Sequence, residues 1–442
     1  MQQSHLARPS GWPISRPNCS ESTWMSLSHQ ERLKSSSLSL WRINKPVSGK
    51  PMRESLDDPI GETKPWRVAV VECRGSCYDV GVQTAKGFRN SPRGRTFKHR
   101  RGRGRFGFSI KNAQAALATY APNIWEELHG LADGLEIPFE AAVMRYSNGR
   151  LAYPTYGCSS LSTPDLFGRN YDYSVGKYDS MLLAIQPMGV NASVGFSDRF
   201  TGRVDGMNEH GLCVALHLVN QSKSWRPGLG CILTVRIVLD QCATTAEAVK
   251  LLKRLPHGLA FSYSLKDAKG VGAVVEASSL EVAVREGKNL ACTNHFQTKR
   301  LQIFNRRSAW TYQRLPPLEA WSKAGLSAEE LFCALNRSAS PVFDHRYAFG
   351  CGTMHTLVCE PASASLLVGV GGDATPQQID FHGWTRGAAI GVTKLEGQLG
   401  GKTRPFDADG PQPRRSSRPR IKSSFSPSPR RKNAGLGPRF TR

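Results

Sequence analysis

Two motifs lie close together near the middle of the chain: Gly157–Ser160, Gly-Cys-Ser-Ser, and Gly168–Tyr173, Gly-Arg-Asn-Tyr-Asp-Tyr. Cysteine is the best nucleophile among the side chains at ambient pH, and a preceding glycine lets a reacting backbone approach closely. The Gly-Cys pair stands where helical patterns give way to strand patterns. Most of the eleven cysteines are expected to be buried apolar residues. The pair alone is therefore a weak signal of catalysis.

Arg169 and Asp172 lie three positions apart on a predicted strand, Leu166–Tyr173. Side chains three positions apart in a strand point to opposite faces. A turn or a bulge is therefore required to bring both side chains to one site. A surface strand that carries a solvated ion pair explains the same two residues.

Three further motifs carry polar residues between apolar runs. Gly206–Leu212, Gly-Met-Asn-Glu-His-Gly-Leu, predicts a tight turn, and an ordinary hairpin explains it. Thr293–Phe296 includes Asn294, whose amide could donate to an oxyanion, although a polar strand end explains the motif equally well. Gly352–Thr356 is equally compatible with a core strand. Singly, none of these motifs decides a function.

The chain divides into four segments by composition and periodicity. Residues 1–67 and 402–442 are rich in Ser, Pro and Arg, which predicts a disordered N-terminal extension and a basic disordered C-terminal tail. Residues 68–157 are predicted to form an N-terminal pro-segment with an Arg-rich loop at 88–105. Residues 158–401 are predicted to form a catalytic β segment, and we expect the two segments to fold as one domain.

The periodicity of the apolar residues predicts an α+β fold, because strands precede a pair of helices at 230–254 and further strands follow it. Thr244 and Glu247 have the spacing of a capping box in the second of these helices. The architecture expected is a four-layer αββα sandwich of two antiparallel sheets covered by helices. The predicted strands are Val68–Cys73, Leu166–Tyr173, Met181–Gln186, Ala192–Phe196, Gly211–Val219, Phe261–Leu265, Val271–Glu276, Val282–Arg285, Thr353–Glu360 and Ser365–Val370. The other predicted helices are Tyr78–Lys86, one around 124–131, one from Pro138 and Ser327–Asn336.

The formal net charge of +24 is concentrated in three appendages. Residues 1–67 carry +4, residues 86–111 carry +10 and residues 402–442 carry +10, which leaves the remainder of the chain neutral. A core built to bind a polyanion is therefore disfavoured, and nucleic acid is not the expected partner. A second hypothesis nevertheless remains, in which the chain binds nucleic acid or an anionic surface through 88–105 and the tail. Arg101–Phe106 resembles RNA-binding Arg/Gly segments, while solvated disordered tails explain the same charge.

Several classes of protein are excluded. No apolar run approaches the roughly 18–20 residues that a membrane span needs, and we find no secretory signal. We therefore expect a cytoplasmic protein with reduced thiols. No Cys-x-x-Cys pair is present, so neither a zinc module nor any other metal site is expected.

Together, and in this order, the motifs resemble the acyl-coenzyme A:6-aminopenicillanate acyltransferase family of the isopenicillin N acyltransferase type. That family belongs to the N-terminal nucleophile hydrolases and is related to the choloylglycine hydrolases. The resemblance extends from about Val68 to Gly372. It rests on Val71–Gly81, Glu127–Gly134, Gly157–Ser160, Gly168–Tyr173, Gly206–Leu212, Thr293–Phe296 and Gly352–Pro361.

The resemblance implies a precursor that cuts itself between Gly157 and Cys158, after which the α and β fragments stay associated. The mature enzyme would form a thioester on Cys158. Water would then complete the hydrolysis of a linear amide, whereas an amine would complete an acyl transfer. The implied substrates are small-molecule amides or acyl-CoA, and no cofactor is expected apart from acyl-CoA as a substrate.

The resemblance also implies roles for five site residues. The Cys158 sulfur would be the nucleophile, and its freed α-amine, with an ordinary pKa of about 7.7–8, would be the base. Arg169 would favour the thiolate and Asp172 would orient the α-amine. Asn294 would hold the oxyanion, with Asn208 near the same intermediate.

The sequence departs from the family pattern in two places. Ser159 stands where the family often has threonine. The family pattern also predicts Ser-x-x-Arg after Thr293–Phe296, but Ser308 is followed by Ala309–Thr311. The nearby arginines, which are Arg306, Arg307 and Arg314, are out of register with that pattern. A third hypothesis, an enzyme that has lost its activity, follows from this missing arginine, although the presence of the other site residues favours an active enzyme.

Overall fold

The computed structural model describes residues 63–91, 94, 110–147, 157–219, 228–305 and 308–400. Most of the predicted N-terminal extension and the whole C-terminal tail lie outside these residues. Lys64–Arg67, which were predicted to belong to the extension, instead begin the first strand. The predicted Arg-rich loop begins as helix, because α1 continues to Asn90, and most of the rest of 88–105 lies outside the described residues. Nucleic-acid binding through these segments therefore stays a prediction.

The described strands form two sheets. One sheet has ten strands in the order β11-β10-β9-β8-β7-β5-β4-β1-β16, with β6 paired to β5, and the other has six in the order β12-β2-β3-β13-β14-β15. The strands of the first sheet are β1 (Lys64–Gly75), β4 (Met181–Pro187), β5 (Ser193–Asp198), β6 (Gly202–Arg203), β7 (Asp205–Asn208), β8 (Cys213–Leu218), β9 (Phe261–Lys266), β10 (Gly272–Ala277), β11 (Val282–Glu286) and β16 (Lys394–Leu399). Those of the second are β2 (Cys158–Ser162), β3 (Phe167–Ser174), β12 (Leu290–Cys292), β13 (Cys351–Glu360), β14 (Ser365–Val370) and β15 (Gln377–Asp380).

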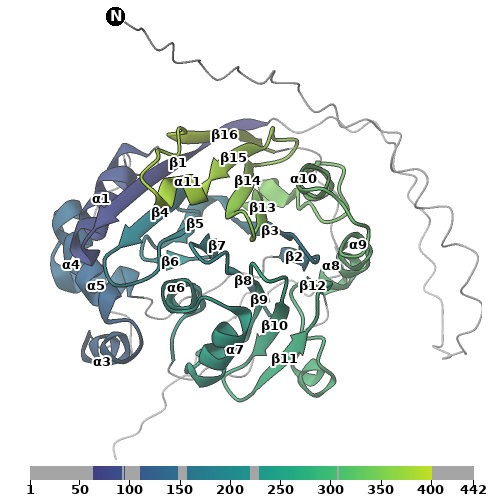
Figure 1. The fold of residues 1–442 in the computed structure, drawn as a ribbon, viewed down its shortest axis with the longest axis horizontal. Coiled ribbons are helices and arrows are strands. Elements are labelled where there is room, and N and C mark those ends of the chain that lie inside the picture. Colours follow the sequence, from purple (N-terminus) through teal and green to yellow (C-terminus); the bar gives the residue numbers. More distant parts are fainter. Residues whose placement is uncertain are drawn as a thin grey trace, which may run out of the picture. The chain divides into compact units, whose positions relative to one another are not determined.

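Helices cover the outer faces of both sheets, which confirms the predicted αββα order (Figure 1). α1 packs on β1 and β4, while α6 and α7 pack on strands farther along the same sheet. α9 and α10 cover the six-stranded sheet, and β2 contacts β8 and β9 across the space between the sheets. The described helices are α1 (Cys77–Asn90), α3 (Ile110–Tyr120), α4 (Pro122–Leu135), α5 (Phe139–Tyr146), α6 (Cys231–Gln241), α7 (Thr245–Arg254), α8 (Ala309–Gln313), α9 (Leu315–Trp321), α10 (Ala328–Asn336) and α11 (Phe381–Thr385). Three 3₁₀ turns, η3 (Val175–Lys177), η4 (Lys299–Phe304) and η5 (Arg346–Phe349), are also present.

One strand pairing differs from the prediction of two purely antiparallel sheets. β1 pairs in parallel with β4, with Ala69 opposite Met181 and Gly75 opposite Pro187. A parallel pair needs a long crossover connection, and the chain between β1 and β4 includes α1 and α3–α5. All other strand-to-strand pairings among the described strands are antiparallel.

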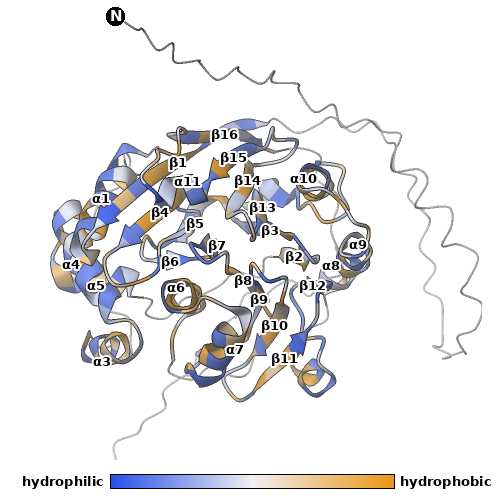
Figure 2. Cartoon of the chain, viewed as in Figure 1, coloured by the Kyte–Doolittle hydropathy of each residue, from blue (hydrophilic) through white to orange (hydrophobic). Residues whose placement is uncertain are grey.

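Local signals explain where several helices begin. Ser327 caps α10, and its side chain and that of Glu330 form a reciprocal capping box. Thr244 caps α7 as predicted by accepting from the Glu247 N–H, but the Glu247 carboxylate accepts from the N–H of Ala243 instead of that of Thr244. The predicted capping box is therefore only half present. Figure 2 shows hydrophobic and hydrophilic residues side by side along α4 and α7, as expected of helices with one buried face.

No helix among the described residues has the length and apolarity that are needed to cross a membrane.

Candidate active site

Cys158 is the first residue of β2, and its side chain is buried between the two sheets. Its sulfur lies 3.7 Å from Nη2 of Arg169, and its main-chain N–H donates to Oδ1 of Asn294 at 2.8 Å. Burial raises the pKa of the thiol to about 11, although the positive charge of Arg169 opposes this shift. Because the thiol is protonated at neutral pH, it needs a base before it can act as a nucleophile.

Gly157 is tightly enclosed. Its carbonyl oxygen accepts from the main-chain N–H of Asp172 at 3.1 Å. A Cβ at this position would lie 2.7 Å from Nη2 of Arg314 and 2.9 Å from Oδ2 of Asp172. Only glycine therefore fits beside the Gly157–Cys158 peptide bond without displacing these two charged groups.

Arg169 on β3 is held from three directions. Its Nη1 donates to the carbonyl of Leu216 on β8 at 2.7 Å, and its Nε lies 2.7 Å from Oδ2 of Asp205. Its guanidinium carbon lies 5.1 Å from the ring centroid of Tyr171. These contacts fix a positive charge next to the Cys158 sulfur, as the resemblance implied.

Asp172 lies on the opposite face of β3 and is fully enclosed. Its Oδ1 accepts from the Thr353 hydroxyl at 2.7 Å, and its Oδ2 lies 3.8 Å from Nη1 of Arg314, without a hydrogen-bond partner among the described residues. Burial, followed by the charge of Asp344, raises the pKa of Asp172 to about 7. A carboxyl beside Gly157 therefore titrates near neutral pH.

The expected bulge between Arg169 and Asp172 is not found in β3, where the two side chains stay on opposite faces; a bulge lies instead on the partner strand β13. On β13, Thr353 lies opposite Asp172 and His355 lies opposite Tyr171, so Met354 is the extra residue. Residues two apart in a regular strand share one face, but the bulge turns Thr353 and His355 to opposite faces. Each charged residue of β3 thereby gains a polar side chain of β13 on its own side.

Asn294 follows β12 and joins the Cys158 group as predicted. Its Oδ1 accepts from the Cys158 N–H and from Nη2 of Arg314, the latter at 2.6 Å. Its Nδ2 donates to the carbonyl of Leu218 at 2.9 Å. These three contacts turn the amide oxygen of Asn294 toward Cys158 and its Nδ2 away, so this geometry does not offer the N–H that the expected oxyanion role requires.

Arg314 is the site residue that the sequence analysis set aside as out of register. It is completely buried between α8 and α9, and its Nη1 donates to the Cys158 carbonyl at 2.6 Å and to Oγ of Ser159 at 2.7 Å. Thr311 occupies the position where the spacing rule expects the arginine, and its hydroxyl accepts from the N–H of Asn294. A fixed spacing rule fails here because the short helix α8 carries the chain back to the site.

Asn208 is not brought into this group. Its Nδ2 donates to the carbonyls of Leu239 and Cys242 at the end of α6, at 2.9 and 2.6 Å. Its Oδ1 accepts from the N–H groups of His210 and Leu212, both at 3.1 Å. Since these bonds use both ends of the amide, Asn208 stabilises the hairpin and the end of α6 rather than an intermediate on Cys158.

His217 lies close to Cys158, against Ser160 of the same strand, and was not among the predicted site residues. Its Nε2 lies 2.9 Å from Oγ of Ser160 and 3.2 Å from Oγ of Ser264. Burial, reinforced by Arg169, lowers the pKa of His217 well below its ordinary value, so the ring is neutral. A histidine within the apolar run of β8 was the available signal.

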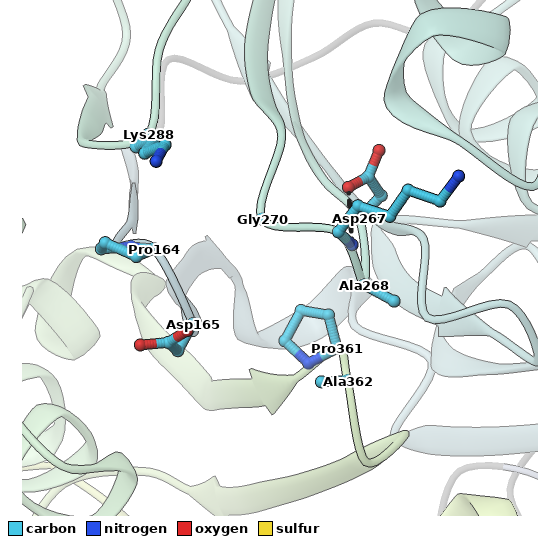
Figure 3. A pocket seen from close by; sticks show the side chains of 9 residues that line it. Pro164, Asp165, Asp267, Ala268, Gly270, Lys288, Pro361 and Ala362 are labelled. Carbon is cyan, nitrogen blue, oxygen red and sulfur yellow. Dashed lines mark hydrogen bonds between the residues drawn. The ribbon is translucent and has the colours of Figure 1, made fainter.

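The pocket drawn in Figure 3 does not include Cys158. Its walls include Pro164, Asp267, Lys288 and Pro361, which lie in turns and loops that connect strands. Cys158 begins β2, and Pro164 lies beyond Ser162, the far end of the same strand, which is about 13 Å from Cys158 at the ordinary rise per residue. The pocket of about 280 Å³ is thus separate from the group around the thiol.

Two sheets are enclosed by helices, and the Gly-Cys junction opens an inner strand, which is the arrangement that the resemblance implied. Residues 161–374 match the model of the acyl-coenzyme A:6-aminopenicillanic acid acyl-transferase family, the family that the motifs resemble. A stretch of 91 residues is 32% identical to an uncharacterized protein of Archaeoglobus fulgidus, covering 20% of this chain and only 15% of that protein.

The chain is also similar to solved structures of amide-hydrolysing enzymes. A penicillin V acylase from Agrobacterium tumefaciens is 19% identical, with 50% of this chain and 86% of that chain covered and a TM-score of 0.32. An N-acylethanolamine-hydrolyzing acid amidase ortholog from Caenorhabditis elegans is 16% identical, with 46% and 93% covered and a TM-score of 0.34. A mutant conjugated bile acid hydrolase from Clostridium perfringens is 16% identical, with 57% and 97% covered and a TM-score of 0.35.

Proposed function

We propose that this protein is a self-processing cysteine enzyme that acts on linear amides or transfers their acyl groups to amines. The observation that carries the proposal is the convergence of Arg169, Arg314, Asp172 and Asn294 on the Gly157–Cys158 junction. A buried cysteine that served only to fill the core would not need two buried arginines and a carboxyl that titrates near neutral pH beside it.

Self-cleavage begins when the Cys158 sulfur attacks the carbonyl carbon of Gly157. The bond from that carbon to the Cys158 nitrogen breaks, the nitrogen takes up the thiol proton, and a thioester forms. Water then hydrolyses the thioester and frees the thiol. The N–H of Asp172, which already donates to the Gly157 carbonyl oxygen, stabilises the negative charge that develops on that oxygen.

The mature enzyme gains its base from this cleavage. A thiol with a pKa of about 11 needs a proton acceptor, and the new α-amine of Cys158 has an ordinary pKa of about 7.7–8. The unpartnered Oδ2 of Asp172 and the Oδ1 of Asn294 orient this amine, while Arg169 stabilises the thiolate. The sulfur then attacks the substrate carbonyl, and the leaving amine takes up the proton.

One acyl-enzyme serves both reactions. Water releases a carboxylic acid from the thioester, whereas an amine acceptor takes the acyl group and forms a new amide. Acyl-CoA supplies the acyl group equally well, because it is itself a thioester. Both fragments stay associated, since residues on either side of the junction share the hydrophobic core.

Intact-mass measurement of the purified protein beside its Cys158→Ala variant tests the proposal. We expect two wild-type fragments that divide between Gly157 and Cys158, and a single full-length variant. An uncut wild-type chain would contradict self-processing. A screen of N-acyl amides and acyl-CoA, with and without an added amine, then separates hydrolysis from transfer by whether an acylated amine appears.

A further inference from the structure

A line of buried side chains leads from the Cys158 sulfur into the space between the sheets. Nη2 of Arg169 lies 3.7 Å from the sulfur, and its Nε lies 2.7 Å from Oδ2 of Asp205. The same carboxylate oxygen lies 2.9 Å from Nε2 of His355, whose Nδ1 lies 2.8 Å from the hydroxyl of Tyr178. Solvent reaches at most a few per cent of each side chain, so these contacts are made in a region of low dielectric.

The hydrogen positions along this line follow from the chemistry of its members. A carboxylate oxygen only accepts, so Nε2 of His355 carries its proton toward Asp205 and Nδ1 accepts from Tyr178. Burial lowers the pKa of His355, which keeps the ring neutral. Burial alone would raise the pKa of Asp205, but His355 and Arg169 hold it below its ordinary value. The Arg169–Asp205 pair is therefore ionised, and a neutral histidine orients its carboxylate.

The His355 ring has little freedom to turn. It stacks on Phe196 of β5 at 3.6 Å between ring centroids and an interplanar angle of 12°. Tyr171 of β3 stacks on it at 5.2 Å, and Tyr178 at 5.7 Å. The charged groups that face it are Asp205 from β7 and Arg169 from β3. The β13 bulge turns the ring to this face, so the position of His355 depends on the same irregularity that places Thr353 against Asp172.

We propose that Asp205 and His355 are positioning residues that hold the Arg169 guanidinium against the Cys158 thiol and thereby set the reactivity of that thiol. The inference rests on the proposed function, in which Cys158 is the nucleophile. His355 donates to the Asp205 carboxylate, and the carboxylate holds the guanidinium of Arg169 by an ion pair, with Oδ2 2.7 Å from Nε. The guanidinium is then held with Nη2 directed at the sulfur, where it stabilises the thiolate. Without the His355 donor, Asp205 can rotate and Arg169 loses this orientation.

The experiment measures the alkylation of Cys158 by iodoacetamide in the full chain as a function of pH. His355→Phe keeps an aromatic ring but removes the donor, whereas His355→Gln restores an N–H donor of similar reach. His257→Phe is the matched control, because His257 is also buried but its Nε2 contacts the carbonyl of Leu252 at 2.7 Å, outside the Cys158 group. Mass spectrometry of the peptide that contains Cys158 separates its alkylation from that of the other cysteines.

We expect the midpoint of Cys158 alkylation to rise by about one pH unit in His355→Phe, a roughly tenfold loss of thiolate at a given pH. His355→Gln should recover most of that shift, and His257→Phe should leave the midpoint unchanged. Tyr178→Phe removes one oxygen and should give a smaller shift in the same direction, which keeps the test open should His355→Phe not fold. An unshifted His355→Phe, an equal shift in His257→Phe, or no recovery in His355→Gln would overturn the inference.

The same samples keep this inference separate from the proposed function. Self-cleavage and amide turnover are recorded beside the alkylation profile. A wild-type chain that is uncut and inactive refutes the proposed function, whatever the profiles of the variants show. Normal wild-type cleavage and turnover, combined with unshifted profiles in His355→Phe and Tyr178→Phe, refute the positioning role alone.

Discussion

Two completely buried arginines, Arg236 and Arg314, differ in how closely carboxylates approach their guanidinium groups. Arg236 on α6 makes ion pairs of 2.7 Å with Glu127 of α4 and with Asp240 of its own helix. Burial disfavours its charge, but the two carboxylates hold the pKa of Arg236 above its ordinary value. Both carboxylates thus pair directly with this cation, and the group connects two helices on the outer face of the ten-stranded sheet.

Arg314 lacks such compensation, and burial lowers its pKa. It donates to the Cys158 carbonyl, the Ser159 hydroxyl and the Asn294 amide oxygen, all neutral acceptors, at 2.6 to 2.7 Å. It approaches the carboxylate of Asp172 only to 3.8 Å. The guanidinium of Arg314 therefore lies beside the Gly157–Cys158 peptide bond and the Cys158 thiol without a carboxylate in direct contact.

The difference shows what separates a structural ion pair from a reactive site. Unpaired donors alone do not make the distinction, because Arg203 near Arg236 also has Nε and Nη2 without hydrogen-bond partners among the described residues. What singles out the Arg314 group is that an under-compensated cation and a carboxyl with a pKa of about 7 lie together beside the Gly157–Cys158 peptide bond. Such a combination of buried charges lowers the stability of the fold. Proteins retain a destabilising combination of this kind where function requires it.

Methionine substitutions at the two arginines should have opposite consequences, and these are the largest effects that we expect. Arg236→Met leaves Glu127 and Asp240 buried without their cation and should lower the free energy of unfolding by about 3–5 kcal/mol. Arg314→Met should slow self-cleavage by about 100-fold or more, with a smaller loss of stability. Urea unfolding and time-resolved intact mass measure the two quantities. Equal destabilisation by both substitutions would contradict the distinction between a structural ion pair at Arg236 and a functional role of Arg314.

Asp172 should make the uncut chain less stable as the pH rises. Its folded-state pKa of about 7 lies above the unfolded value near 3.9, so the folded chain binds the proton more tightly. Its contribution is fully present below about pH 4 and is lost as the pH rises through 7. In the uncut Cys158→Ala background, Asp172→Asn should therefore add about 2–4 kcal/mol at pH 8 and almost nothing at pH 4. A gain independent of pH would mean that Asp172 is ionised throughout.

Most of the fold could be predicted from the sequence, because apolar periodicity reports which residues a sheet or helix buries. The strand β2 was not predicted, because Cys158–Ser162, Cys-Ser-Ser-Leu-Ser, is buried on both faces and shows no alternation of apolar and polar residues. The parallel pairing of β1 with β4 was not predicted either, because strand pairing depends on contacts between residues far apart in sequence.

The site could be predicted in part. Cys158, Arg169, Asp172 and Asn294 do lie together, since each belongs to a motif with fixed spacing on a strand or at its end. Arg314 could not be found by spacing, because a short helix separates it from the motif that it serves. The motif around Asn208 indicated a hairpin as well as a site, and the structure shows the hairpin.

Gly157→Ala should slow self-cleavage by about tenfold, because its Cβ would lie within 3 Å of both the Arg314 guanidinium and the Asp172 carboxylate. Gly176→Ala is the matched control, since a Cβ at Gly176 meets no atom within 4 Å. Fragment formation is followed by intact mass in both variants. If Gly157→Ala is cut as fast as Gly176→Ala, the close packing around the junction has no role in cleavage.

The smallest effect that we expect concerns Thr353. Comparing it with Thr356 distinguishes a hydrogen bond that supports Asp172 from an ordinary hydrogen bond in the core. Its hydroxyl donates to Asp172 at 2.7 Å and accepts from the N–H of Asp344 at 2.8 Å. Thr356 on the same strand makes an equivalent pair of bonds with Asn170 and Asn336, both at 2.8 Å.

Valine at position 353 or at position 356 should therefore cost about 1 kcal/mol of unfolding free energy, since each removes the same number of buried hydrogen bonds. Only Thr353→Val should also slow the proposed self-cleavage, by a few fold, because Thr353, unlike Thr356, contacts a group that lies against Gly157. Urea unfolding gives the first quantity and fragment formation gives the second. Equal rates of cleavage in the two variants would mean that Asp172 keeps its position without Thr353, and that burial alone sets its protonation.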